Sequence, residues 1–345
     1  MRRAARATGA GRASREGLPQ REATLGRASQ RLTTAYLFAA MTPVQTVVTR
    51  LRRAAVGQVR LLVGGTGDDT VERNRRDTGL FGPQSACWKV HGDFTSMMVG
   101  GIAALYLQML HPGPLAGVWD HSDFRKDMLG RLRRTARFIA GTTYGDCAEA
   151  QGLIDHVRKI HGGVRGHLPN GTPYAADDPT LLTWVHVAEV SSFLDAYLRY
   201  VDSNFPADEQ DRYFRETAEI ARRLGASDPP TTRDAVRAYL TAMRPQLHCD
   251  HRTRAVAAAL ASQPPPSAAA GPAMVAAFDA ARDLLPTWAR ELHGFSPSPI
   301  RSVVARLALT GLAPAMRWAL VNSAEARARR RATELGAMAT ADPLT

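Results

Sequence analysis

The chain has 345 residues, of which 45% are hydrophobic, so it can bury a substantial core and is not a disordered protein. Its formal net charge is +12. Half of that excess lies before residue 32, where eight arginines stand against two glutamates (8 − 2 = +6), and nearly every other basic residue is also an arginine. Arginine in place of lysine, with abundant alanine, is typical of a GC-rich genome, so the charge does not indicate a nucleic-acid partner.

The cysteines and the apolar runs exclude two further classes of protein. Cys87, Cys147 and Cys249 are widely spaced and odd in number, which excludes a disulfide framework and a CxxC zinc site. We therefore expect a reducing compartment and a cytoplasmic location. The longest apolar run, 97–110, is shorter than the roughly 18 to 20 residues that span a bilayer, so no stable membrane insertion is expected.

Residues 1–40 are rich in arginine, glycine, serine and alanine, a composition that predicts a disordered leader. Arg2-Arg3 faintly resembles a twin-arginine export signal, but the apolar stretch that follows is distant and short. A start at Met41 is the alternative. From Thr42, a threonine cap, a proline and an apolar period of three to four residues predict the first helix.

The rest of the chain is predicted to be helical. Segments with a three-to-four-residue apolar period, many of them opening with Asp, Ser, Thr or Pro, are 96–110, 124–145, 146–166, 179–201, 206–225, 231–244 and 272–285. One hairpin is expected near Asn170-Gly171, the strongest short turn signal in the chain. We predict one all-α domain over 41–323 with this short hairpin insertion, followed by a basic segment over 324–345 that forms a solvated helix or tail.

One histidine of the helix over 179–201 is the most informative candidate. From Leu181 to Tyr197 this helix is apolar nearly all round and should be central, yet His186 and Glu189 share one of its sides. The pair can bond internally, or the imidazole can bond a backbone carbonyl. It can also be the axial ligand of a haem, which needs one neutral imidazole facing an apolar slot. A di-iron centre is disfavoured, because it needs a second His/carboxylate pair.

Other polar residues offer weaker signals. Arg131 and Thr135 are four apart on one helix face, with Arg134 beside them, and such a face offers cations for haem propionates and a hydroxyl near the distal side. His111 precedes a proline and His161 precedes two glycines, so both are expected at helix ends. Zinc hydrolases and serine hydrolases are disfavoured, since neither HExxH nor GxSxG occurs.

Several blocks of the sequence resemble the catalytic domain of the MpaB-type oxygenases and the rubber oxygenases, or latex-clearing proteins. The resemblance runs from about Gly79 to Val201, and more loosely to about Asn322. The blocks are GLFGPQSACWKVHGDF, LYLQMLHPGPLAGVWDHSDFRKDMLGRLRRTARFIAGTTYG, IHGGVRG and YAADDPTLLTWVHVAEVSSFLDAYLRY.

The resemblance implies an all-α fold related to the globins that holds a b-type haem. It places the proximal ligand to the iron at His186, with His161 as the second choice, and an RxxxT motif at Arg131 and Thr135. The distal lysine of the rubber oxygenases corresponds to Arg134, whose guanidinium stays protonated and does not bind iron as an amine does.

The resulting hypothesis is a haem-dependent oxygenase. Dioxygen would add across a carbon–carbon double bond of an apolar, unsaturated or isoprenoid-like small molecule and leave carbonyl products. Arg131, Arg134 and Thr135 would polarise dioxygen or anchor propionates, and Glu189 or a backbone carbonyl would orient the imidazole. The alternative is a haem-free helical binding protein with an apolar ligand pocket.

Overall fold

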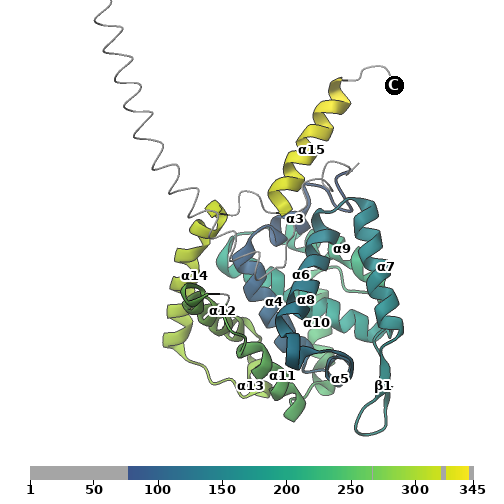
Figure 1. The fold of residues 1–345 in the computed structure, drawn as a ribbon, viewed down its shortest axis with the longest axis vertical. Helices are drawn as coiled ribbons and strands as arrows, with labels where there is room; N and C mark the ends of the chain where they lie inside the picture. Colours follow the sequence, from purple (N-terminus) through teal and green to yellow (C-terminus); the bar gives the residue numbers. More distant parts are fainter. Residues whose placement is uncertain (1–76, 266, 320–323, 342–345) are drawn as a thin grey trace, which may run out of the picture. The chain divides into compact units, whose positions relative to one another are not determined.

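A computed structural model describes residues 77–265, 267–319 and 324–341 (Figure 1). The predicted leader and the predicted helix from Thr42 lie outside the described residues. The described helices are α3 (Ala86–His91), α4 (Phe94–Gln108), α5 (Pro112–His121), α6 (Phe124–Tyr144), α7 (Cys147–Gly162), α8 (Pro179–Tyr200), α9 (Ala207–Leu224), α10 (Arg233–Met243), η1 (Arg244–Gln246), α11 (His251–Ala261), η2 (Ala268–Ala270), α12 (Gly271–Leu284), α13 (Thr287–His293), α14 (Pro299–Ala319) and α15 (Ala324–Ala341).

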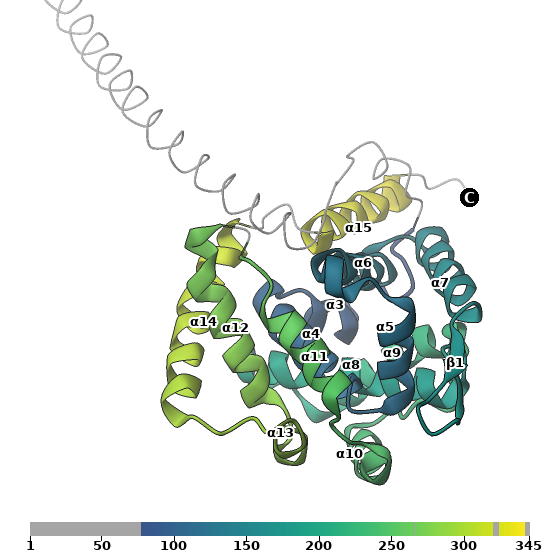
Figure 2. The same ribbon diagram turned by 60° about the horizontal axis from the view of Figure 1, so that its bottom comes forward.

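The all-α class is confirmed, and α8 is the central helix as its composition predicts. The Asp178 carboxylate caps it by accepting hydrogen bonds from the backbone N–H groups of Thr180 and Leu181, with Pro179 in the first turn. Its long neighbour is α4, which lies along α8 in the middle of the bundle (Figure 2). Two helices that are apolar on most sides bury each other, so α4 and α8 form the core around which the other helices pack.

The contact between α4 and α8 is close at Gly100. A Cβ atom there would lie 2.9 Å from the carbonyl oxygen of Ser192 and 2.9 Å from Cδ1 of Phe193. We expect Gly100→Ala to lower the free energy of unfolding by about 1–3 kcal/mol, because one methyl group must push two packed helices apart. Urea unfolding followed by circular dichroism measures this change.

Gly152 provides the matched control for that substitution. It lies within α7, and a Cβ atom there would have no neighbour within 4 Å. Gly152→Ala should therefore raise the free energy of unfolding by about 0.5–1 kcal/mol through helix propensity alone. Equal effects of the two substitutions would contradict a close approach at Gly100.

The predicted hairpin is confirmed as the two-stranded sheet of the described chain. Strand β1 (Arg165–His167) pairs antiparallel with β2 (Pro173–Ala175). Gly171 has a φ of +84°, which only glycine adopts without strain, and the Asn170 side chain accepts a hydrogen bond from the Thr172 backbone N–H. The hairpin joins the end of α7 to the start of α8.

Several helices were not predicted. They are α3, α5, α11, α13 and α14. Helices α3 and α13 are too short to show an apolar period. Helix α5 begins Pro-Gly-Pro, a sequence typical of a loop, but in the structure His111 caps this helix and Pro112 lies in its first turn. The start of α11 is fixed by Asp250, which caps the helix through a capping box with Thr253.

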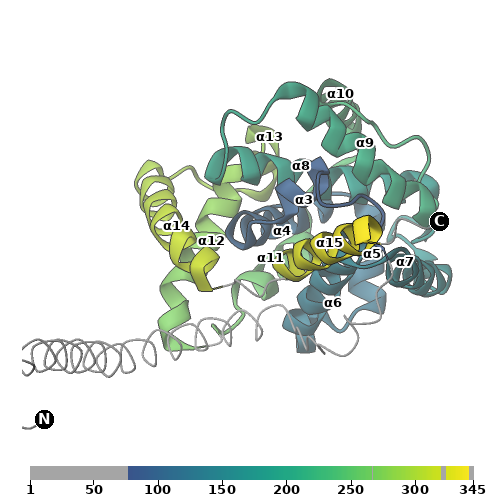
Figure 3. The same ribbon diagram turned by 90° about the horizontal axis from the view of Figure 1, so that it is seen from above.

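The basic C-terminal segment is the helix that the sequence allowed, but it is not wholly solvated. It forms α15, which lies across α6 (Figure 3). Arg331 is 7% exposed and donates hydrogen bonds to the backbone carbonyls of Tyr144 at 2.7 Å and Asp77 at 3.2 Å. One arginine of the run is therefore buried because it satisfies carbonyl groups at the C-terminal end of α6.

Length and composition do not allow any single described helix to cross a bilayer. Helices α4 and α5 are long and apolar enough only when they are taken together, and the chain bends by 101° between them.

Candidate functional site

His186 lies on the central helix with an unpaired nitrogen. Its Nε2 atom is buried and has no hydrogen-bond partner among the described residues. This nitrogen therefore does not bond to Glu189, which lies one turn later in α8, as the sequence would allow. A buried polar atom without a partner is costly and rare in folded proteins, and it points to a group that binds there.

The charge states of these two side chains follow from burial. Burial lowers the pKa of His186 to about 4, and the positive charge of Arg222 on α9 adds to this effect. Burial raises the pKa of Glu189 to about 7. At neutral pH the imidazole is therefore neutral and keeps a free lone pair, which is the form that binds a metal.

The three residues expected from the RxxxT motif do not share one environment. Arg131 is half-buried, and its Nη1 lies 3.4 Å from the Ser122 hydroxyl. Arg134 is exposed and pairs with Asp127 at 3.5 Å. Thr135 is also exposed, and its hydroxyl donates to the Arg131 carbonyl at 3.3 Å. Of the three, only Arg131 reaches the interior.

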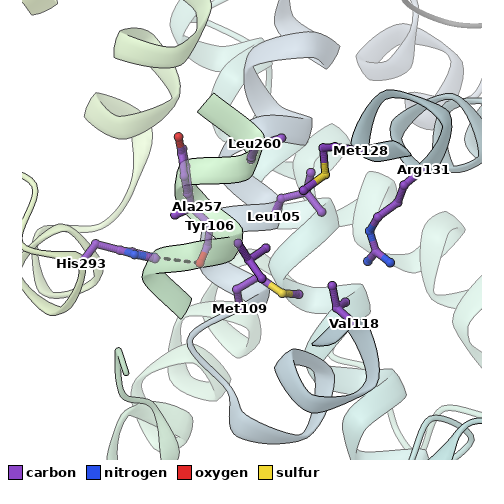
Figure 4. Close-up of a pocket in the computed structure, with 10 residues that line it drawn as sticks. Leu105, Tyr106, Met109, Val118, Met128, Arg131, Ala257, Leu260 and His293 are labelled. Atoms are coloured by element: carbon purple, nitrogen blue, oxygen red, sulfur yellow. Dashed lines mark hydrogen bonds between the residues drawn. The ribbon is translucent and has the colours of Figure 1, made fainter. Parts of the chain in front are cut away.

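Arg131 lines an apolar pocket between α4, α5, α6, α11 and α13 (Figure 4). The cavity is small: its volume of about 10 Å³ has room for about one water molecule. A larger molecule therefore needs movement of the helices. The lining residues are Leu105, Tyr106, Met109, Val118, Met128, Arg131, Val256, Ala257, Leu260 and His293.

His161 lies in the last turn of α7, as its sequence context predicts, and lines a different, open cavity of about 470 Å³. Most of the residues around this cavity are charged, among them Asp155, Arg158 and Lys159. Burial lowers the pKa of His161, Asp177 opposes this, and the charge of Arg131 adds to it. The structure thus brings Arg131 near His161, whereas the cation that acts on His186 is Arg222.

A second histidine, the partly buried His91 on α3, was not predicted to have a role. Its Nδ1 lies 2.9 Å from Thr143 Oγ1 and its Nε2 lies 2.9 Å from Tyr213 Oη. The thiol of Cys87 is 3.6 Å from the same Nδ1. Both nitrogens are satisfied, so His91 joins α3, α6 and α9 and is not available as a ligand. The contacts with Thr143 and Tyr213 join residues more than fifty positions apart, so no local signal in the sequence reveals them.

The His91 network makes stability depend on pH. Burial lowers the pKa of His91 from 6.5 to about 3, so between these values the unfolded chain binds a proton that the folded chain does not. We expect the free energy of unfolding to fall as pH decreases through this window, by up to about 1.4 kcal/mol per pH unit from this residue. Urea unfolding of wild type and His91→Gln across the window checks it. An unchanged slope in the variant would contradict the assignment.

His293 is another histidine that the sequence did not single out. It is 8% exposed, its Nε2 lies 2.9 Å from the Tyr106 carbonyl, and its Nδ1 is buried without a partner among the described residues. It lines the same apolar pocket as Arg131, on the other side of the lining shown in Figure 4. It ends the short helix α13, which carries no apolar period, so its burial is a consequence of tertiary packing alone.

Within the described ranges, no group of three His, Cys, Asp or Glu side chains is placed to hold a bare metal ion. A haem needs fewer protein ligands than a bare ion, because its porphyrin supplies four nitrogens and a single imidazole can attach it to the protein. The unpaired Nε2 of His186 fits that requirement.

The chain was compared with known proteins. A family model described as ER-bound oxygenase mpaB/B'/Rubber oxygenase, catalytic domain, matches residues 88–318, from α3 into α14 and well over half of the chain. No curated protein and no solved structure matches this chain. The match covers the central helix α8, the hairpin and the arginine-bearing helix α6. The chain therefore belongs to the family of the mpaB and rubber oxygenase catalytic domain.

Proposed function

We propose that this chain is a haem b-dependent oxygenase that acts on an apolar, unsaturated or isoprenoid-like molecule. Membership of an oxygenase family supports the reaction class. The observation that carries the haem is the buried, unpaired Nε2 of His186 on the central helix. When bound, haem supplies the activation of dioxygen for addition across a carbon–carbon double bond.

The residues of α8 would hold and tune the cofactor. His186 is neutral at neutral pH because burial lowers its pKa to about 4, so no proton has to leave before it binds iron. Glu189 titrates near neutral pH, since burial raises its pKa to about 7, and it lies one turn from the imidazole. In its protonated form it adds no negative charge beside the iron, and in its ionised form it is able to accept a hydrogen bond from the imidazole.

Arg131 would supply a positive charge from the apolar pocket that it lines. It has no carboxylate partner among the described residues, and burial lowers its pKa. A half-buried cation in an apolar pocket is stabilised by an anion, and a haem propionate or a polarised dioxygen provides one. Thr135 and Arg134 would act with it only after α6 turns or shifts, because both side chains are exposed.

His161 is the alternative iron ligand, and one observation favours it. The charge of Arg131 contributes to the lowered pKa of His161, whereas the positive charge that acts on His186 is that of Arg222. Against it, His161 borders an open cavity lined largely by charged side chains, where water would compete for the iron. We prefer His186 to His161 as the iron ligand because the buried Nε2 of His186 has no partner among the described residues.

The reaction is tested by oxygen uptake and product trapping. Haem-loaded protein is incubated in air with a soluble isoprenoid alkene, and carbonyl products are trapped as hydrazones. We expect oxygen consumption matched by carbonyl formation, and neither without oxygen. Uptake of oxygen without carbonyl products, or no uptake with any of a panel of alkenes, would contradict cleavage of a double bond.

A further inference from the structure

Helix α14 exposes a row of large apolar side chains. Ile300 is 78% exposed, Val303 57%, Val304 60% and Leu307 68%. Their spacing of three, four and seven residues places them on one face of the helix. We call these four residues the α14 stripe. Single exposed apolar residues are ordinary, but a contiguous row marks an interaction surface.

The opposite face of α14 is the one that belongs to the core. Ala305, Leu309 and Ala313 are buried, and the helix packs on α12, with further contacts to α4 and α8 (Figure 2). At 100° per residue, this small-residue face lies about half a turn from the stripe. The stripe therefore points away from the bundle and packs against nothing in the described part of the chain.

The flanks of the stripe are basic. Arg301 and Arg306 are both exposed, and the helical period puts one on each side of the stripe. From Pro299 to Ala319 the helix contains no aspartate or glutamate. An apolar face bordered by arginines that reach outward is the pattern of a helix lying in a lipid interface, where the stems and apolar side chains enter the acyl boundary and the charges meet headgroups.

We propose that α14 docks this protein on the surface of a membrane that contains anionic lipid, with the stripe in the interface and Arg301 and Arg306 on the headgroups. The charge pattern favours lipid over two other occupants. A second copy would bring two acid-free, arginine-flanked helices together, and the chain's own apolar segment over 33–67 also has arginines and no acidic residue. Both arrangements place like charges side by side, whereas an anionic surface complements them. The proposal is independent of the cofactor.

The test uses the full chain and sedimentation with vesicles. One set of vesicles is phosphatidylcholine alone and the other is phosphatidylcholine mixed with phosphatidylglycerol. We expect binding to the mixed vesicles that weakens with added salt. The double substitution Val303→Ser with Leu307→Ser should weaken this binding by about tenfold or more, because two large side chains no longer enter the interface. Arg301→Glu with Arg306→Glu should have a similar effect on the mixed vesicles.

Matched controls distinguish binding through the α14 stripe from non-specific binding to vesicles. The controls are Ile160→Ser, at a residue of α7 that is 51% exposed, and Arg237→Glu, at an exposed residue of α10. Each control should leave vesicle binding within about twofold of wild type. Circular dichroism verifies that each variant is folded. Failure of the wild type to bind mixed vesicles, or equal binding of the folded stripe variant, would overturn the proposal. A light-scattering mass that falls from dimer to monomer in the stripe variant, without vesicle binding, would assign the stripe to a second copy instead.

Discussion

His186→Ala is expected to reduce haem retention from about one haem per chain to less than about a tenth of that, because the b-type cofactor is then left without an axial bond to the protein. The substitution removes a side chain whose Nε2 is already without a hydrogen bond, so the fold loses little else. Haem is measured as the pyridine haemochrome per mole of chain, after identical purification of variant and wild type.

Three companion variants make this result specific. His167→Ala removes an exposed histidine of β1 and should keep wild-type haem content. His186→Gly leaves a cavity, and added imidazole should restore haem binding and the Soret band. His161→Ala should keep most of the haem. If His161→Ala loses the haem while His186→Ala keeps it, the ligand is His161 and our assignment on α8 is wrong.

Arg131→Ala is expected to lower turnover of the haem-loaded protein by about tenfold to a hundredfold, the range for removing one preorganised charge from a buried site. Arg131 is half-buried in an apolar pocket, and among the described side chains its hydrogen bond is the 3.4 Å contact with Ser122. A cation held there without a carboxylate is costly, so it is retained for an anion that binds beside it. Steady-state oxygen uptake, normalised to haem content, measures the loss.

The controls for Arg131 lie on the same helix. Arg137 is exposed on α6, and Arg137→Ala should change turnover by less than about twofold. Arg131→Lys keeps the charge and loses the planar fork, so it should recover part of the activity if charge is what matters and none if bidentate geometry is. Equal turnover in Arg131→Ala and Arg137→Ala would remove Arg131 from the site.

Much of the fold follows from local signals in the sequence. Asp178-Pro179 predicts the start of α8, and Asn170-Gly171 predicts the turn of the hairpin, because cap and turn residues act on their own backbone. α14 was not predicted. Four large apolar residues lie on its outer face, while two alanines and Leu309 lie on its inner face, so its sequence lacks the pattern of a core helix.

The site was predictable only in part. The prominence of His186 follows from composition alone, since a histidine inside an apolar helix stands out. That its Nε2 has no partner, and that Arg131 points inward while Thr135 stays exposed, depends on how α6 packs on its neighbours. His293 joins the pocket of Arg131 from nearly the other end of the domain, and pairing at such separation has no sequence signature. The relation to the globin fold, the domain limits at 41 and 323, and the cytoplasmic location stay predictions.

The visible absorption spectrum of freshly purified full-length protein, expressed with added haem precursor, tests the central claim most directly. Our account predicts a Soret band and about one b-type haem per chain by pyridine haemochrome. A protein that is folded by circular dichroism yet shows no Soret band, and takes up no haem on reconstitution, would contradict it and favour a haem-free helical binding protein.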